Sequence, residues 1–94
     1  MEIKDKITEQ KLRAYFEISE KALETIKSSV SKGKEKEAKE IIEMVHCYIS
    51  DAKFFKEKND FVNCLASLSY AYGWIDCGAR LGIFNVKDRK MFTV

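Results

Sequence analysis

The sequence has no proline, and only four of its 94 residues are glycine. Proline breaks helices and glycine weakens them, so their scarcity favours long, uninterrupted helices. Gly33 is the only glycine before Gly73, which leaves a single natural break in most of the chain. The composition therefore indicates an all-helical protein.

A long apolar run is also absent, because Ser67, Ser69 and Gly73 interrupt the apolar stretch at 64–75. A membrane-spanning helix needs about 20 consecutive apolar residues. Residues 2–6 are mostly charged and no apolar region follows them, which argues against a signal peptide. We therefore expect a cytoplasmic protein with no membrane partner.

Neither sign of charge dominates, since 17 lysines and arginines accompany 15 aspartates and glutamates, for a net charge of +2. Nucleic-acid-binding proteins usually carry a basic face. The nearest approach to one is the group of Lys87, Arg89 and Lys90 close to the C-terminus. The mixed charge therefore disfavours nucleic acid as a partner. If the protein does bind a nucleic acid, this basic group is the expected contact.

Cysteine is scarce and histidine scarcer, with three cysteines, one histidine and no Cys-x-x-Cys spacing. Cys64 and Cys77 on one helix would lie about 20 Å apart at 1.5 Å per residue, whereas zinc ligands lie within roughly 2.3 Å of the metal. His46 and Cys47 are sequence neighbours and point about 100° apart on a helix, which does not make a nucleophile pair. We therefore expect reduced cysteines that pack as small apolar residues, no metal site and no cofactor.

Apolar residues recur at steps of three and four, which predicts three helices over about residues 8–31, 34–58 and 60–81 and an apolar tail over 82–94. Thr8 is suited to cap the first helix, and Gly33 to end it. Asn59 and Asp60 suit a short turn in which Asp60 caps the third helix. A turn this short folds the third helix back antiparallel to the second. The sequence thus predicts one domain over 1–94, an antiparallel three-helix bundle with an apolar C-terminal tail.

The third predicted helix is apolar on two opposite faces. Its first face carries Phe61, Leu65, Leu68, Tyr72, Ile75 and Ala79. Its second face carries Ala66, Tyr70, Trp74, Cys77 and Leu81. A helix of this kind must be covered on both sides, and two neighbours in a bundle lie too close together to do so. The C-terminal tail or a second copy of the chain is therefore expected to cover the second face.

Between these faces runs a stripe of Ser69, Gly73, Asp76 and Arg80. Asp76 precedes Arg80 by four residues, the favourable order for an ion pair within a helix. One interpretation is a structural pair that locks this helix to a neighbour. The other is a pocket in which Asp76 and Arg80, with Asp51 of the second helix, bind a small molecule or a nucleotide.

Glycine inside a helix costs roughly 1 kcal/mol relative to alanine, so Gly73 and Gly78 require a reason. We expect both to mark thin places where a neighbour approaches closely, with Gly73 facing the second helix near Val45. Gly82 is suited to end the third helix in the left-handed conformation.

Three segments together resemble an archaeal family known as domain of unknown function 357: YISDAKFF, the Asn59–Asp60 turn and YAYGWIDCGARLGIFNV. The matching positions are Tyr48, Asp51, Ala52, Asp60, Tyr70, Ala71, Gly73, Trp74, Asp76, Arg80 and Gly82. At the turn the family pattern has glycine where this chain has Asn59, and asparagine also tolerates the left-handed region. The resemblance covers residues 48–86 and implies a small helical protein, without any activity, substrate or catalytic residue.

These observations favour a non-enzymatic protein-interaction module that uses Tyr70, Trp74 and Leu81 as its contact surface, with a homodimer as one form. Contiguous exposed aromatic residues are typical of interfaces. The alternative is a protein that binds a small molecule or a nucleotide, in one version an enzyme, with its pocket around Asp76 and Arg80.

Overall fold

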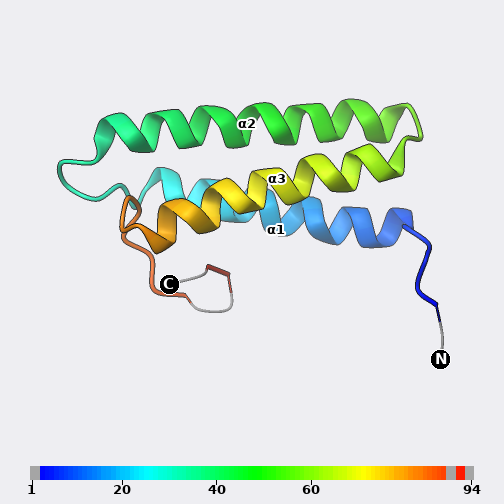
Figure 1. Cartoon of the computed structure of the whole chain (residues 1–94), viewed down its shortest axis with the longest axis horizontal. Coiled ribbons are helices and arrows are strands. Elements are labelled where there is room, and N and C mark those ends of the chain that lie inside the picture. Colours follow the sequence, from blue (N-terminus) through cyan, green and yellow to red (C-terminus); the bar gives the residue numbers. More distant parts are fainter. Residues whose placement is uncertain (1–2, 89–90, 93–94) are drawn as a thin grey trace.

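The computed structural model describes residues 3–88 and 91–92, which contain three α-helices: α1 (Glu9–Lys27), α2 (Glu35–Glu57) and α3 (Phe61–Arg80). The helices lie alongside one another, with α3 in front of α1 and next to α2 (Figure 1). Packing is most extensive between α2 and α3. The predicted all-α bundle of three helices is confirmed. None of these helices combines the length and the hydropathy that a lipid-spanning segment requires.

The helix α1 begins as predicted but ends earlier. The Thr8 side chain accepts a hydrogen bond from the Lys11 N–H at 3.1 Å, as an N-cap does. The helix ends at Lys27, four residues before the expected end, where the hydroxyls of Ser28 and Ser29 donate to the Thr25 carbonyl at 3.1 and 2.7 Å. Such bonds compete with the helical backbone pattern and favour its termination.

Gly33 therefore lies in the connection between α1 and α2 and does not end α1. Its φ of +86° is in the left-handed region, as its residue type suggests. Its N–H donates to a carboxylate oxygen of Glu35 at 2.8 Å, at the start of α2. The observed bounds of α2 and α3 agree with the predicted ranges to within one residue.

The turn between α2 and α3 is built by Asn59 and Asp60. Asn59 has a φ of +59°, and the Asp60 N–H donates to the Phe55 carbonyl at 2.9 Å, which closes the end of α2. The Asp60 carboxylate then accepts from the Asn63 N–H at 3.1 Å and caps α3. One turn therefore satisfies two helix ends and reverses the chain, as the sequence predicts.

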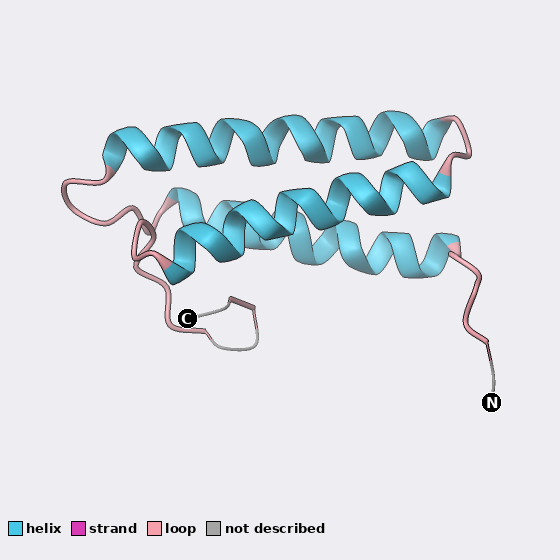
Figure 2. Ribbon diagram, in the orientation of Figure 1, coloured by secondary structure: helices cyan, strands magenta, loops and turns pink. Residues whose placement is uncertain are grey.

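At its other end α3 stops at Gly82, whose φ is +75°. The Gly82 N–H donates to the Ala79 carbonyl at 3.2 Å and the Ile83 N–H to the Gly78 carbonyl at 2.9 Å. These two bonds form a Schellman motif, the ending expected of a glycine at this position. The loop that follows turns toward the α1–α2 connection (Figure 2).

The C-terminal segment is fastened to that connection. Val30 and Phe84 form an isolated antiparallel bridge, flanked by bonds from the Ser31 N–H to the Ile83 carbonyl at 2.9 Å and from the Asn85 N–H to the Ser29 carbonyl at 2.7 Å. Phe84 is 1% exposed. Its ring thus becomes part of the core at the end of the bundle where α3 stops.

The buried side chains form two apolar clusters. The larger one holds Phe84 and Phe92 of the C-terminal segment together with residues of all three helices, among them Ile26, Val45 and Ile75. The smaller one, toward the Asn59 turn, consists of Leu12, Ala52, Cys64 and Leu68. Both clusters contact the side of α3 that faces α1 and α2, so the opposite side of α3 faces outward.

Candidate interaction surface on the third helix

The second apolar face of α3 lies on the surface. Tyr70 is 63% exposed, Trp74 38% and Leu81 66%. Ala66 and Cys77 on the same face are exposed as well. The C-terminal segment, one of the two expected covers, packs elsewhere, because the Tyr72 hydroxyl donates to the Met91 carbonyl beside the other face of α3. Of the described residues, those of α2 cover the second face in part, at Tyr70 and Trp74, and the rest of that face is exposed.

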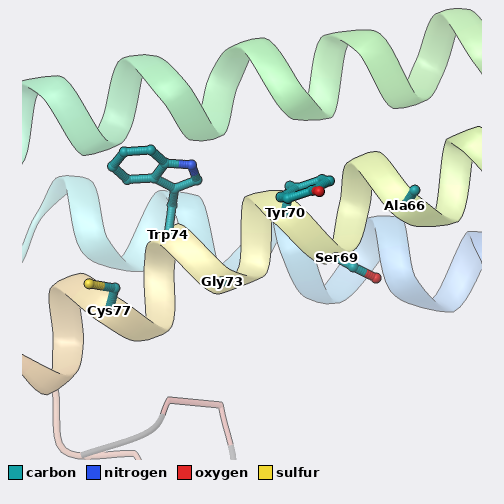
Figure 3. A pocket seen from close by; sticks show the side chains of 6 residues that line it. All are labelled: Ala66, Ser69, Tyr70, Gly73, Trp74 and Cys77. Atoms are coloured by element: carbon teal, nitrogen blue, oxygen red, sulfur yellow. The ribbon is translucent and has the colours of Figure 1, made fainter.

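The exposed face is a shallow groove formed by one helix. Its lining residues are Ala66, Ser69, Tyr70, Gly73, Trp74 and Cys77. Trp74 rises from α3 toward α2, while Ser69 points to the other side of the helix and Gly73 lies between them (Figure 3). Ligand pockets are concave and enclose most of a small molecule, whereas one side of a single helix presents an open surface. The groove is therefore an open hollow and not an enclosed pocket.

The aromatic side of the groove is held in place by α2. The rings of Tyr70 and Tyr48 stack with centroids 5.5 Å apart and planes inclined by 20°. Exposed Met44 lines the surface next to Trp74, together with Glu40 and Glu43. A ring fixed by stacking loses little conformational entropy when a partner binds.

On its other side the groove continues onto α1. Tyr15 and Ile18 of α1 are exposed and line a hollow with Leu65, Ser69 and Tyr72. Met44, Tyr15 and Ile18 belong to this surface but were not predicted from the sequence. Ile18 carried a usable signal, because it is an apolar residue away from the buried stripe of its helix. We name the exposed apolar area of α3 with its flanks on α1 and α2 the α3 face.

The part of the α3 face that α3 itself contributes has very little charge, whereas its flank on α2 carries Glu40 and Glu43 beside Trp74. From Phe61 to Ile75 the helix contains no charged residue. The first charged side chains are the half-buried Asp76 and the exposed Arg80, both in the last turns of α3. A solvent-exposed helix ordinarily carries charged side chains on its outer side, and over its first four turns α3 carries none.

The pocket around Asp76 and Arg80, the alternative drawn from the sequence, stays a prediction. Asp76 is half-buried and Arg80 is exposed, both in the last turns of α3. Asp51 is exposed on α2. Asp51, Asp76 and Arg80 do not line the hollows along α3 that contain Tyr70, Trp74 or Tyr72.

The two glycines inside α3 have different surroundings. A Cβ added to Gly78 would lie 2.5 Å from Cε2 of Phe84 and 3.2 Å from Cδ1 of Ile41, so a neighbour does approach closely there. A Cβ added to Gly73 would meet no described atom within 4 Å, apart from its chain neighbours and the nearby backbone of its own helix. The expected approach of α2 to Gly73 near Val45 is therefore wrong, because Gly73 lies on the outward side of α3.

The cysteines also differ from one another. Cys64 is buried, and burial raises the pKa of its thiol, with the charge of Lys56 acting in the opposite direction and Asp60 adding to the rise. Cys47 and Cys77 are exposed, so the expectation of apolar packing holds for Cys64 alone. The described residues contain no cluster of three or more histidine, cysteine, aspartate or glutamate side chains able to hold a metal.

The hydroxyl of Tyr72 is held protonated. Burial, and after it the negative charges of Asp76 and Asp88, raise the pKa of this phenol. The protonated hydroxyl donates to the Met91 carbonyl and fastens the C-terminal segment to α3. Of the basic group near the C-terminus, Lys87 is exposed, and Arg89 and Lys90 lie outside the described residues.

Most of the chain matches the model of one protein family. The model described as protein of unknown function (DUF357) matches residues 14–84, which run from the first turns of α1 to the bridging residue Phe84. Comparison with curated proteins and with solved structures finds no significant match. The matched range includes every segment on which the resemblance rests except the two residues after Phe84. The chain belongs to the DUF357 family of proteins of unknown function.

Proposed function

We propose that this protein is a non-enzymatic protein-interaction module whose contact surface is the α3 face, and that it acts as a homodimer. The observation that supports this proposal is an outer helix side that is exposed, apolar and free of charge over four turns. Exposed apolar patches of this kind mark interaction sites in soluble proteins.

The exposed side chains supply a moderate driving force. Full burial of a large apolar side chain stabilises by about 1.5–3 kcal/mol, and Val62, Tyr70 and Leu81 each keep more than half of their surface exposed. Two copies of such side chains together contribute roughly 10 kcal/mol or less, which is similar to the estimated entropic cost of association of about 4–15 kcal/mol. We therefore expect an association that depends on protein concentration.

Light scattering after size exclusion, over a series of loading concentrations, tests the proposal. The wild-type protein should approach twice the chain mass of 10.9 kDa as the concentration rises. Trp74→Glu should stay monomeric, because it would bury two unpaired carboxylates in the interface. Phe54→Glu is the matched control, since Phe54 is an aromatic residue of α2, 55% exposed, outside the α3 face.

Circular dichroism of both variants checks that the helices are intact. A wild-type protein that remains monomeric at every concentration would contradict the homodimer. Equal loss of the dimer in both variants would contradict the α3 face as the contact surface.

A further inference from the structure

We infer that the partner of the α3 face is a second copy of the chain whose α3 lies antiparallel to the first, with the two helices crossing at Gly73. This inference rests on the proposed function and adds the arrangement of the partners. It is carried by the position of one glycine, by the small residues around it and by the placement of charge.

Among the described residues, no neighbour explains the glycine at position 73. Glycine in a helix interior costs about 1 kcal/mol relative to alanine. Gly78 has a reason, since Phe84 occupies the space of its missing side chain, but no described group does this at Gly73. A glycine on the outside of a helix allows the backbone of a second helix to come close.

Residues with small side chains continue along the helix on both sides of Gly73. Ala66, Ser69, Gly73 and Cys77 follow one another at steps of three and four and line the bottom of the groove. Residues at these steps lie on one side of a helix. The larger Tyr70 and Trp74 stand beside this row on the side of α2 (Figure 3). The row offers a second helix a path about 17 Å long, at 1.5 Å per residue.

The absence of charge on α3 itself around Gly73 fits an identical partner, and the nearby charges of Glu40 and Glu43 lie on the α2 flank, beside Trp74. In a symmetric dimer each side chain near the two-fold axis meets its own copy, so a charge there would face a like charge. On α3 no charged residue precedes Gly73 after the capping Asp60, and the next one is the half-buried Asp76. A binding site for a basic or an acidic partner would instead carry complementary charge at its centre.

Arg80 decides between the two possible orientations. It lies seven residues after Gly73, close to two full turns, and is therefore on the same line of the helix. In a parallel pair the exposed Arg80 would meet its own copy inside the interface. In an antiparallel pair the two guanidinium groups would be about 21 Å apart along the axis, and the helix dipoles would oppose each other favourably.

The area of the α3 face suits a small dimer. From Val62 to Leu81 it is about 28 Å long, at 1.5 Å per residue. Its flanks on α1 and α2 extend the width to about 20 Å, given helix spacings of 8–10 Å. The flat projection is then roughly 560 Å², and the accessible area of the uneven surface is larger. Stable dimers bury about 800 Å² per partner, so the α3 face lies near the lower end of that class.

The antiparallel arrangement predicts which residues of the two copies face each other. Ser69 and Cys77 lie four residues before and after Gly73. In the antiparallel dimer Ser69 of one copy therefore faces Cys77 of the other. The two Ser69 residues, and likewise the two Cys77 residues, are separated by about 12 Å along the axis, too far for a disulfide, which needs Cα atoms within about 7 Å.

Disulfide trapping of the full chain tests this statement. Cys47→Ser removes the other exposed thiol, and Cys64 is buried. Three proteins are compared after mild oxidation: C47S, C47S/S69C and C47S/S69C/C77S. Only C47S/S69C should yield a covalent dimer on a non-reducing gel. A bond between residues 69 and 77 of one chain is excluded, because they too are about 12 Å apart on the same helix.

Light scattering of the same samples before oxidation tests the homodimer separately from the antiparallel arrangement. If the protein is a dimer, and C47S or C47S/S69C/C77S forms the covalent dimer as readily as C47S/S69C, the antiparallel arrangement is overturned. The homodimer itself would then still stand. A dimer that none of the three traps would overturn the crossing at Gly73. Monomers throughout would overturn the proposed homodimer and the inference with it.

Gly73→Ala provides an independent measurement. The added methyl group would meet no neighbouring group of the described part of the protomer but would lie in the crossing. Self-association should become weaker by about tenfold or more, the effect of overpacking a close contact, while the melting temperature at a dilution that leaves monomers should rise. Undiminished association of this variant would contradict a close crossing at Gly73.

Discussion

Gly78→Ala should destabilise the fold although alanine is the better helix former. The new methyl group would lie 2.5 and 2.7 Å from two ring carbons of Phe84. That ring is 1% exposed and belongs to the larger apolar cluster, so it has no free space into which to turn. Overpacking of this kind costs about 1–3 kcal/mol, against a gain in helix propensity of about 1 kcal/mol. We expect the free energy of unfolding to fall by up to about 2 kcal/mol.

Urea unfolding followed by circular dichroism measures this change, and two further variants isolate its cause. Gly73→Ala is the matched control, because the same substitution in the same helix meets no described neighbour and should stabilise the monomer by up to about 1 kcal/mol. Phe84→Ala removes the obstructing ring at a cost of about 3–5 kcal/mol, which a chain of this size, stable by about 5–14 kcal/mol, is expected to tolerate.

In the Phe84→Ala background the effect of Gly78→Ala should change sign and become stabilising by up to about 1 kcal/mol. This reversal is the coupling that a double-mutant cycle detects between residues in contact. If Gly78→Ala destabilises both backgrounds equally, the Phe84 ring is not what requires the glycine. If it stabilises the otherwise wild-type chain, the ring yields without cost and the reasoning from the close approach is refuted.

Three other predictions follow from single contacts. Asp60→Ala should lower the free energy of unfolding by about 1 kcal/mol, because it removes the cap of α3, while Asp60→Asn keeps most of it; equal losses would contradict the capping role. In the native protein Cys64 should react with a thiol reagent far more slowly than Cys47, since burial raises its pKa and blocks access, and similar rates would contradict this burial. The pKa of the Tyr72 hydroxyl is raised in the folded protein above its ordinary value of 10.0. As the pH rises past 10.0, Tyr72 therefore loses its proton in the unfolded chain before it does so in the folded one, and the free energy of unfolding should fall from that pH upward. Unfolding curves across that range should show a shallower fall for Tyr72→Phe, and identical pH dependence would contradict the shift.

The helix boundaries that the sequence predicted well depend on local chemistry. Thr8 and Asp60 cap helices that begin at the next residue, and the N–H groups of Gly82 and Ile83 end α3 by donating to carbonyls three and five positions before them. Such interactions are written in short stretches of sequence, so residue type and spacing suffice to find them.

The parts that could not be predicted depend on contacts between distant residues. The apolar pattern of α1 continues to Val30, but Val30 pairs with Phe84, and no local pattern announces that bridge. Gly73 and Gly78 look alike in the sequence because glycine has no side chain that shows which side is buried. Only the packed positions of Phe84 and Ile41 distinguish them.

The candidate surface was predictable in part. The two apolar faces of the third helix follow from its periodicity, and the exposure of the second face fits the expectation that the bundle alone could not cover it. The contributions of Tyr15 and Met44 could not be read from the sequence, because they depend on the angle at which α1 and α2 pack against α3.

The bridge between Val30 and Phe84 has a consequence for the order in which the chain assembles. The Asn59 turn joins α2 and α3 through neighbouring residues, so this pair of helices can form through local contacts. The bridge instead closes a loop of more than fifty residues and needs the ends of α1 and α3 already side by side. We therefore expect the bridge to form last in folding, after the three helices have packed together.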